Sequence, residues 1–395
     1  MKYWRGYLVA AILGAITLGL TTLASKYSIL VDMVYPYLTR TVQSFLATWS
    51  SGVDFCVWQV ALVLLLVTVL SSLVLLLVLR WNFVQWLGWV LTGVMLVVFL
   101  HTGIYGLNYY AGPLANDIRL TVSEYTLQEL QDATVYYRDL ANQLADQMPR
   151  DDQGQLTYSS FSQLAQQAGE GFDVLTYEEC YSVFAGSTDP VKELGWADMY
   201  TSMGITGMTM PITGEAAVNP QTPSVGLPFT MCHEMAHRMC IATERDANFA
   251  AFLACRANTS EEFQYSAYFM AYTYCYNALA SVNSTEAAIS SARIAAGVND
   301  NFARDLNAYF DFFAANYDEK AGAFADTVND TYLKASGNEG GITSYGEVCD
   351  LLVSLYIQEV VLPAEEEDAK STFDPYDETQ VDLSGIVGAL PKEEP

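Results

Sequence analysis

FTMCHEMAHRMCIATERDANFAAF, residues 229–252, contains two of the three histidines in this 395-residue chain. His233 and His237 are four residues apart, so both imidazoles project from the same face of an α-helix. Glu234 lies about 100° further round the helix than His233. This order, His-Glu-x-x-His, is typical of a helix that binds Zn²⁺.

In such a site the metal polarises a water molecule and the substrate carbonyl, and the glutamate takes the proton of the water. We therefore expect His233 and His237 to be zinc ligands and Glu234 to be the general base. The alternative is a metal-free helix with two hydrogen-bonded core histidines. Burying Glu234 unpaired between them would be costly, which favours the zinc site.

A zinc site needs a third protein ligand. The segment TERDANFAAFL begins like a helix, with Thr243 as its N-cap. Glu244 is the expected ligand and Asp246 is the alternative, which otherwise is an ordinary acidic residue in the first turn of a helix. Asn248, one turn after Glu244, is expected to hydrogen-bond a ligating histidine.

The N-terminal quarter of the chain contains three long windows without charge. They predict transmembrane helices at roughly 6–25, 57–79 and 83–105. The first window could instead be a signal peptide, with MKYWR before it and TTLAS as the cleavage site. Between the first two windows, ILVDMVYPYLTRTVQSFLATW is amphipathic and is expected to lie along the membrane surface.

The charges divide unevenly along the chain. Residues 1–109 hold five Lys and Arg against two Asp, and 43 of the 45 acidic residues follow them. This acidic surplus argues against a nucleic-acid partner, because phosphates would be repelled. Arg80 and the basic N-terminus are expected in the cytoplasm, so the chain from about 107 onward is expected outside the cell membrane. The expected partners are the lipid bilayer and a peptide or protein substrate.

These patterns predict a membrane domain (1–109), an extracytoplasmic domain (110–362) and an acidic, disordered tail (363–395). The extracytoplasmic domain is mainly α, with a helix in 120–148, shorter helices in QLTYSSFSQLAQQAGEGF and PVKELGWADMY, and a run of helices to about 358. GITGMTMPITGEAAVNP (204–220) instead predicts a strand or hairpin. It is either a purely structural hairpin or an edge strand that pairs with a substrate backbone.

The seven cysteines leave the redox state of the domain open. Six of them follow residue 109, and none belongs to a CxxC motif. Location outside the cytoplasm permits disulfides, and buried free thiols are an equal alternative.

The Glu-x-x-x-Asn spacing after HExxH resembles the gluzincin pattern, in which the Glu is the third zinc ligand. More closely, the chain resembles a family of bacterial multi-pass membrane proteins that is defined by a domain of unknown function. That family combines N-terminal transmembrane helices with a zincin-like HExxH domain, which implies a zinc metallopeptidase without naming a substrate. The resemblance covers nearly the whole chain except the tail, and it rests on GLNYYAGPL (106–114), GITGMTMPITGEAAVNP (204–220), LPFTMCHEMAHR (227–238), ERDANFAAFLA (244–254), YSAYFMAYTYCYNAL (265–279) and YLKASGNEGGITSYGEVCDLL (332–352).

Two positions depart from the family pattern. Cys240 stands where the family has Gly, which would end the HExxH helix with a positive φ. Cys240 could be a disulfide partner or a further zinc ligand. Asp246 stands where the family tends to have Glu.

A second electrophile should face the oxyanion, opposite the zinc. Three tyrosines lie in the family-like stretches, Tyr265, Tyr332 and Tyr345, and Tyr345 is the expected one. The alternative for each is core packing, since the chain has 26 tyrosines.

The sequence therefore predicts a mainly α, membrane-anchored, gluzincin-like zinc metallopeptidase with its catalytic domain outside the cytoplasmic membrane. The alternative is a non-catalytic membrane receptor or scaffold with a structural zinc site. In that case a fourth protein ligand, such as Cys240 or Asp246, would close the coordination sphere. A third alternative is a metal-free helical membrane protein.

Overall fold

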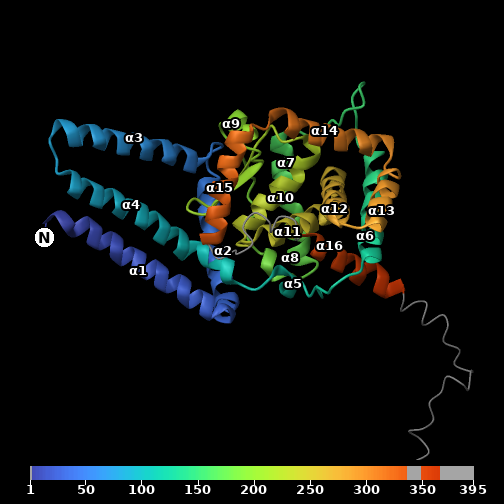
Figure 1. The fold of residues 1–395 in the computed structure, drawn as a ribbon, viewed down its shortest axis with the longest axis horizontal. Coiled ribbons are helices and arrows are strands. Elements are labelled where there is room, and N and C mark those ends of the chain that lie inside the picture. Colours follow the sequence, from blue (N-terminus) through green and yellow to red (C-terminus); the bar gives the residue numbers. More distant parts are fainter. Residues whose placement is uncertain (1, 336–347, 365–395) are drawn as a thin grey trace, which may run out of the picture.

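The computed structural model describes residues 2–335 and 348–364. A helical domain forms one end of the molecule, and three long helices extend from it side by side (Figure 1). Each of these three is long and apolar enough to cross a membrane, which indicates a membrane protein. Their bounds agree with the prediction to within one residue: α1 (Arg5–Lys26), α3 (Val57–Val78) and α4 (Phe83–Ile104).

Helices α1 and α4 cross where two glycines meet. A Cβ atom on Gly6 would lie 2.5 Å from the carbonyl carbon of Gly88, so only glycine allows the two backbones this close. Thr92 donates its hydroxyl to the carbonyl of Gly6 across the same contact, at 2.8 Å. Helix α1 is therefore packed as a member of the bundle, as a transmembrane helix would be.

The segment between the first two long helices forms α2 (Ser28–Ser50), which runs across the ends of the bundle, where the domain begins (Figure 1). Its polar side faces the protein: Arg40 and Gln43 are buried. Its apolar side faces outward, since Phe45 and Trp49 are 71% and 64% exposed. The amphipathic character predicted for this segment is confirmed.

The start of α3 is bound to the domain by a buried carboxylate. Glu215 accepts hydrogen bonds from the backbone N–H groups of Val57 (2.7 Å) and Trp58 (2.9 Å). Lys192 pairs with the same carboxylate at 2.8 Å and also donates to the carbonyl of Ser50. A negative charge at a helix N-terminus is favourable, so this cluster fastens the long helix α3 to the domain.

The domain is mainly helical. The run of helices predicted to about residue 358 is present among the described residues. The helix predicted within 120–148 begins at Leu127, where Thr126 and Glu129 form a capping box. The helices are α5 (Leu114–Asp117), α6 (Leu127–Ala145), α7 (Phe161–Gln167), α8 (Glu170–Tyr177), α9 (Ala197–Ser202), α10 (Leu227–Arg238), α11 (Glu244–Ala257), α12 (Glu261–Ser281), α13 (Thr285–Ala295), α14 (Asp300–Asn316), α15 (Glu319–Ala335) and α16 (Val348–Tyr356).

A three-stranded sheet packs against α10. Strands β2 (Gly207–Met210) and β3 (Glu215–Val218) are antiparallel, which confirms the predicted hairpin. Strand β1 (Lys192–Glu193) pairs with β3 in parallel and was predicted as part of a helix. Only its pairing with β3 makes this short segment extended. In the order β1-β3-β2, strand β2 is an edge strand.

Helix α11 runs through the centre of the domain and is buried along nearly its whole length. Helix α8 crosses it very closely, because a Cβ atom on Gly171 would lie 1.9 Å from the carbonyl oxygen of Ala254. On another side α11 packs against α10. The two helices that carry the HExxH motif and the residues after it are thus held rigidly together.

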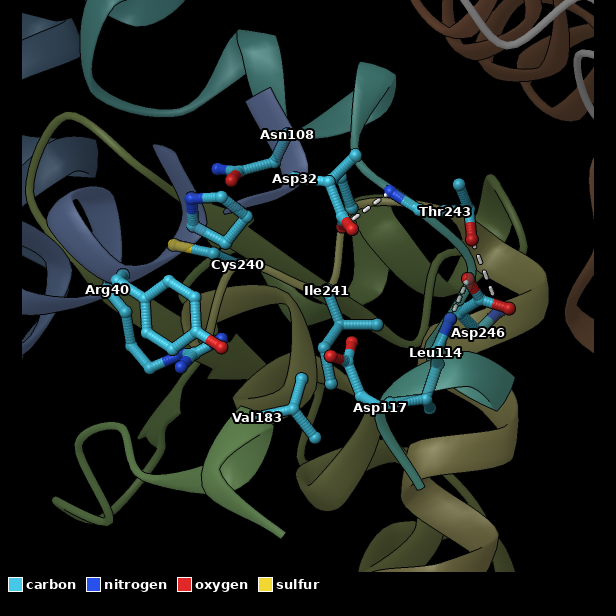
Figure 2. A pocket seen from close by; sticks show the side chains of 15 residues that line it. Asp32, Arg40, Asn108, Leu114, Asp117, Val183, Cys240, Ile241, Thr243 and Asp246 are labelled. Carbon is cyan, nitrogen blue, oxygen red and sulfur yellow. Dashed lines mark hydrogen bonds between the residues drawn. The ribbon is translucent and has the colours of Figure 1, made fainter. Parts of the chain in front are cut away.

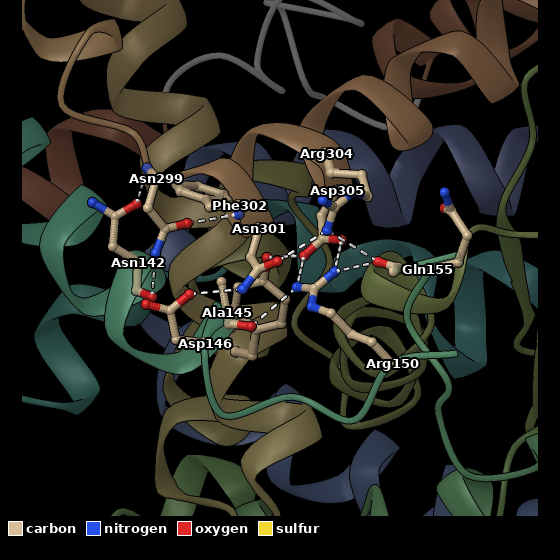
Figure 3. Close-up of polar contacts among 12 residues, drawn as sticks. Asn142, Ala145, Asp146, Arg150, Gln155, Asn299, Asn301, Phe302, Arg304 and Asp305 are labelled. Atoms are coloured by element: carbon tan, nitrogen blue, oxygen red, sulfur yellow. Dashed lines mark hydrogen bonds and ion pairs between the residues drawn. The ribbon is translucent and has the colours of Figure 1, made fainter. Parts of the chain in front are cut away.

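A polar network joins the end of α6 to the start of α14 (Figure 3). Arg150 donates two hydrogen bonds to Asp305, at 2.8 and 2.7 Å, and Asp305 is almost fully buried. Tyr265 donates to the same carboxylate at 2.6 Å. These bonds raise the pKa of Arg150 above its usual value. The network gives Tyr265 a structural role in this part of the domain.

Candidate metal centre

The HExxH motif lies on α10, which ends in a tight reversal towards α11. The N–H of Cys240 donates to the carbonyl of His237 (2.9 Å), and the N–H of Ile241 donates to that of Ala236 (3.1 Å). This is the Schellman pattern, which requires a positive φ at Cys240, and the observed φ is 70°. The reversal brings Glu244, at the start of α11, back over the face of α10 that carries the histidines.

Three donor atoms from the two helices converge. The Nε2 atoms of His233 and His237 are 3.1 Å apart. Oε2 of Glu244 lies 3.2 Å from the first and 3.5 Å from the second. Each side chain is between 10% and 13% exposed, so the donors are close to solvent but not open to it. These atoms lie close enough to hold one metal ion.

The ring of His237 is held in one orientation by the backbone. Its Nδ1 lies 2.9 Å from the carbonyl oxygen of Ile241, which can only accept, so Nδ1 carries the proton. Nε2 is then left with a free lone pair in the neutral ring, as a metal ligand requires. His233 has no such support among the described residues, because its buried Nδ1 has no partner.

Glu234 points from α10 towards the hairpin. The hydroxyl of Thr209 in β2 lies 2.8 Å from Oε2 of Glu234 and 2.8 Å from its backbone carbonyl. The neighbouring backbone approaches so closely that a Cβ atom on Gly207 would lie 2.5 Å from Oε1 of Glu234. Strand β2 therefore both binds and confines this carboxylate, which is only 5% exposed.

The charges of the cluster act strongly on one another. Burial raises the pKa of Glu234, and the two histidines beside it lower it only in part. Burial also opposes the charge of His237, yet Glu244 raises the pKa of His237 to about 9. Burial disfavours the Glu244 carboxylate as well, but the histidines hold the pKa of Glu244 well below its usual range. Glu244 and His237 therefore stabilise each other's charged forms.

Asp246 is not a member of this group and bonds instead to Leu114 and Thr243 (Figure 2). Its Oδ2 accepts the backbone N–H of Leu114 at 3.1 Å, and its Oδ1 pairs with Arg245 at 3.1 Å. Its own N–H donates to Thr243, which is the predicted N-cap of α11. Of the two carboxylates considered from the sequence, the structure brings Glu244 to the histidines and uses Asp246 to hold the start of α5.

Asn248 does not make the expected contact. It is buried, and its Nδ2 has no hydrogen-bond partner among the described residues. The orienting bond to a histidine comes from the carbonyl of Ile241 instead. The reversal after α10 brings the Ile241 carbonyl back to His237. The spacing of side chains along α11 does not predict this contact.

Cys240 lies outside the group of converging donors. Its thiol is buried beside Thr39 and Asn108, and burial raises the pKa of Cys240 to about 11. Within the described residues, the group that could hold a metal consists of His233, His237 and Glu244. All seven cysteines are free thiols in the structure.

The three tyrosines singled out in the sequence have different places. Tyr265 belongs to the polar network with Asp305. Tyr332, on α15, lies 3.2 Å from Nε2 of His101 and 3.5 Å from the hydroxyl of Tyr109. Tyr345 lies outside the described residues, as does the acidic tail from residue 365 onward.

One tyrosine beside the site was not predicted. Tyr105 follows the last residue of α4 and packs in a buried cluster with Cys240 and Ala242, in the connection between the two metal-site helices. Burial raises the pKa of Tyr105, and the carboxylates of Glu244 and Glu234 raise it further. The long helix α4 therefore ends directly against the candidate metal centre. The family-like stretch GLNYYAGPL (106–114) begins at the residue after Tyr105, but it did not indicate that Tyr105 packs beside the candidate centre.

A comparison with protein families gives a match over most of the chain. A family model described as "Protein of unknown function (DUF3810)" matches residues 31–353, which include most of α2, the two later long helices and every residue of the candidate centre. No curated protein and no solved structure matches the chain.

Proposed function

The chain belongs to the DUF3810 family, a family of unknown function, and we propose for it the function that its own site supports best. The proposal is a membrane-anchored zinc metallopeptidase that hydrolyses peptide bonds with a metal-activated water. The observation that carries it is the convergence of His233, His237 and Glu244 with Glu234 buried beside them.

The donor set fits a zinc ion. Zinc–nitrogen and zinc–oxygen bonds of about 2.0–2.1 Å in a tetrahedron place neighbouring ligand atoms about 3.3 Å apart. The three observed separations are 3.1, 3.2 and 3.5 Å. Two imidazoles and one carboxylate also suit zinc better than they suit Ca²⁺ or Mg²⁺, which prefer oxygen ligands.

The fourth position supports catalysis over a structural role. Among the described residues the group contains three protein donors, and both Cys240 and Asp246 point elsewhere. A structural zinc site would use a fourth protein ligand, whereas a catalytic site leaves one position for water. The receptor or scaffold alternative lacks this supporting observation.

Bound zinc would polarise a water molecule and the substrate carbonyl. Glu234 would accept the proton of that water and pass it to the leaving amine. Burial raises the pKa of this carboxyl, and a raised pKa is the direction in which a general base is commonly tuned. Thr209 would hold the carboxylate in place during both transfers.

The edge strand offers a place for the substrate. Strand β2 pairs with β3 on one side only, and it carries the two residues that touch Glu234. An extended peptide could add to this edge through main-chain hydrogen bonds. Its carbonyl groups would then lie beside the carboxylate and the metal ligands.

The proposal places the domain outside the cytoplasm. The N-terminus and the turn between α3 and α4 lie together at the far end of the three helices, opposite the domain (Figure 1). Both carry basic residues, Lys2 and Arg5 in one and Arg80 in the other. Basic residues favour the cytoplasmic side of a membrane.

The test is the zinc content of the full chain, purified in detergent without chelators, together with cleavage of a degenerate peptide mixture. We expect about one zinc per chain in the wild type and in Glu234→Gln, and loss of zinc in Glu244→Ala. Cleavage should be present only in the wild type. A wild-type chain that contains no zinc, or a Glu234→Gln variant that cleaves as fast as the wild type, would overturn the proposal.

A further inference from the structure

Helix α2 has its apolar face on the outside of the protein. Four residues along one face are strongly exposed: Val34 (52%), Leu38 (62%), Phe45 (71%) and Trp49 (64%). Their spacing of four and seven residues places them in one stripe. The opposite face is polar and is bound to the domain, so this stripe cannot turn inward. Helix α2 lies where the three long helices meet the domain (Figure 1). A membrane surface at that level would cover the exposed apolar stripe.

A second helix has an apolar face at the same edge of the domain. On α15, Phe324 is 65% exposed and Val328, one turn later, is 53% exposed. The end of this helix contacts the end of α4, where Tyr332 meets His101 and Tyr109. Helices α2 and α15 therefore both meet the bundle where it enters the domain (Figure 1).

The candidate metal centre lies close to this surface. Arg40 of α2 donates to the carbonyl of Met239, the residue that caps α10, at 3.1 Å. Two packed helices have axes about 8–10 Å apart. The end of α10, the helix that carries the histidines, therefore lies about 8–10 Å above the axis of α2.

Strand β2 gives a second measure of the distance between the candidate metal centre and α2. It begins at Gly207 beside Glu234 and ends at Met210. The next residue, Pro211, accepts a hydrogen bond from Gln43 of α2 at 3.0 Å. Three residue steps along a strand cover about 10 Å. An extended chain paired with β2 would thus run from the catalytic carboxylate to the membrane-facing helix.

We infer that the substrates are polypeptides anchored in the same membrane and cut about 10 Å above its surface, rather than freely diffusing peptides. This inference rests on the proposed peptidase function. The fixed contacts of α2 with Met239 and Pro211 set the height of the cut. A bond closer to the anchor than about three extended residues could not reach the centre.

The test uses the full, zinc-loaded chain in lipid vesicles and degenerate peptides that carry one palmitoyl group. The random segment is separated from the lipid by spacers of one, four, eight or sixteen residues, and acetylated peptides of the same composition serve as controls. We expect no cut at any bond within about three residues of the lipid, the fastest cleavage with the four-residue spacer, and a decline at sixteen as the effective concentration falls. Acetylated peptides should be cut at least tenfold more slowly.

The outcomes separate the inference from the proposed function. Equal cleavage of palmitoylated and acetylated peptides, or equal cleavage with all four spacers, would overturn the inference and leave the peptidase intact. A simple gain in concentration at the vesicle surface would raise all spacers alike, so the dependence on spacer length is decisive. Failure of the zinc-loaded chain to cleave any peptide would overturn the peptidase function and the inference with it.

A second measurement tests the membrane position without any activity. In a Cys180→Ser background, a spin label replaces Phe45 in α2 or, as a control, Ile289 in α13, which is 56% exposed. We expect the label at position 45 to collide with oxygen, which dissolves in lipid, and the label at 289 to collide with a water-soluble nickel chelate. Access of nickel to position 45 would overturn the inference. Protection from both reagents, as when a second copy covers α2, would also overturn it.

Discussion

The hydroxyl of Thr209 lies 2.8 Å from the Glu234 carboxylate and 2.8 Å from the backbone carbonyl of the same residue. An edge strand thus holds the carboxylate beside the proposed metal ligands. We expect Thr209→Val to lower kcat about 10- to 100-fold, since a hydrogen bond to a charged group contributes about 1.5–3 kcal/mol. Zinc content should not change. Thr213→Val in the same hairpin is the matched control, and an equal loss in both variants would contradict this role.

Gly207 is expected to be intolerant of any side chain. A Cβ atom there would lie 2.5 Å from Oε1 of Glu234, and the carboxylate cannot move away without leaving Thr209. We expect Gly207→Ala to retain zinc and to lose most of the peptidase activity. The measurement is zinc content beside turnover of the best-cleaved peptide. Full activity in this variant would show that Glu234 has more freedom than the structure indicates.

The third ligand can be tested by comparing the two carboxylates. Glu244 lies 3.2 Å and 3.5 Å from the histidine nitrogens, whereas Asp246 accepts the N–H of Leu114. We expect Glu244→Gln to weaken zinc binding at least tenfold. Asp246→Asn should keep zinc and lower the thermal midpoint, because it weakens a buried hydrogen bond and removes the ion pair with Arg245. The reverse pattern of zinc loss would make Asp246 the ligand.

The reversal at Cys240 predicts an unusual order of stability. Its φ of 70° costs a residue with a side chain about 1–2 kcal/mol, which glycine avoids. We therefore expect Cys240→Gly to unfold at a higher temperature than Cys240→Ala. Cys255, in the interior of α11, is the control. There Ala should be more stable than Gly by about 1 kcal/mol. The same order at both positions would contradict the strained reversal.

The thiols should differ sharply in reactivity. Burial raises the pKa of Cys240 to about 11, so its reactive thiolate is scarce at pH 8. The thiolate fraction increases about tenfold for each unit by which the pH rises towards this pKa. Cys180 is exposed. We expect iodoacetamide at pH 8 to alkylate Cys180 in the folded chain and to spare Cys240, as followed by peptide mass spectrometry. Equal labelling would mean that Cys240 is ionised or open to solvent.

The sequence was sufficient for features that depend on neighbouring residues. The long helices follow from uninterrupted apolar windows, and the pair His233 and His237 follows from a spacing of four. The helix start at Glu244 follows from the cap at Thr243. In each case the interaction spans one or two turns, so the residue order alone contains it.

Features that depend on distant residues could not be predicted. Strand β1 is extended only because it pairs with β3, more than twenty residues later. The contact of Asp246 with Leu114 joins positions 132 residues apart. Thr209 was recognised only as part of a hairpin, because its bond to Glu234 depends on how that hairpin packs against α10. Tertiary contacts, and not local preferences, settle these positions.

The bond between Glu215 and the start of α3 also bears on the order of synthesis. Glu215 follows Val57 by 158 residues. If the chain is synthesised at about 5–20 residues per second, Glu215 is added roughly 8 to 30 s after the start of the second long helix, α3. The membrane anchor is therefore completed by the domain that it carries. A chain interrupted before residue 215 would have all three long helices but would leave the N–H groups at the start of the second one without this partner.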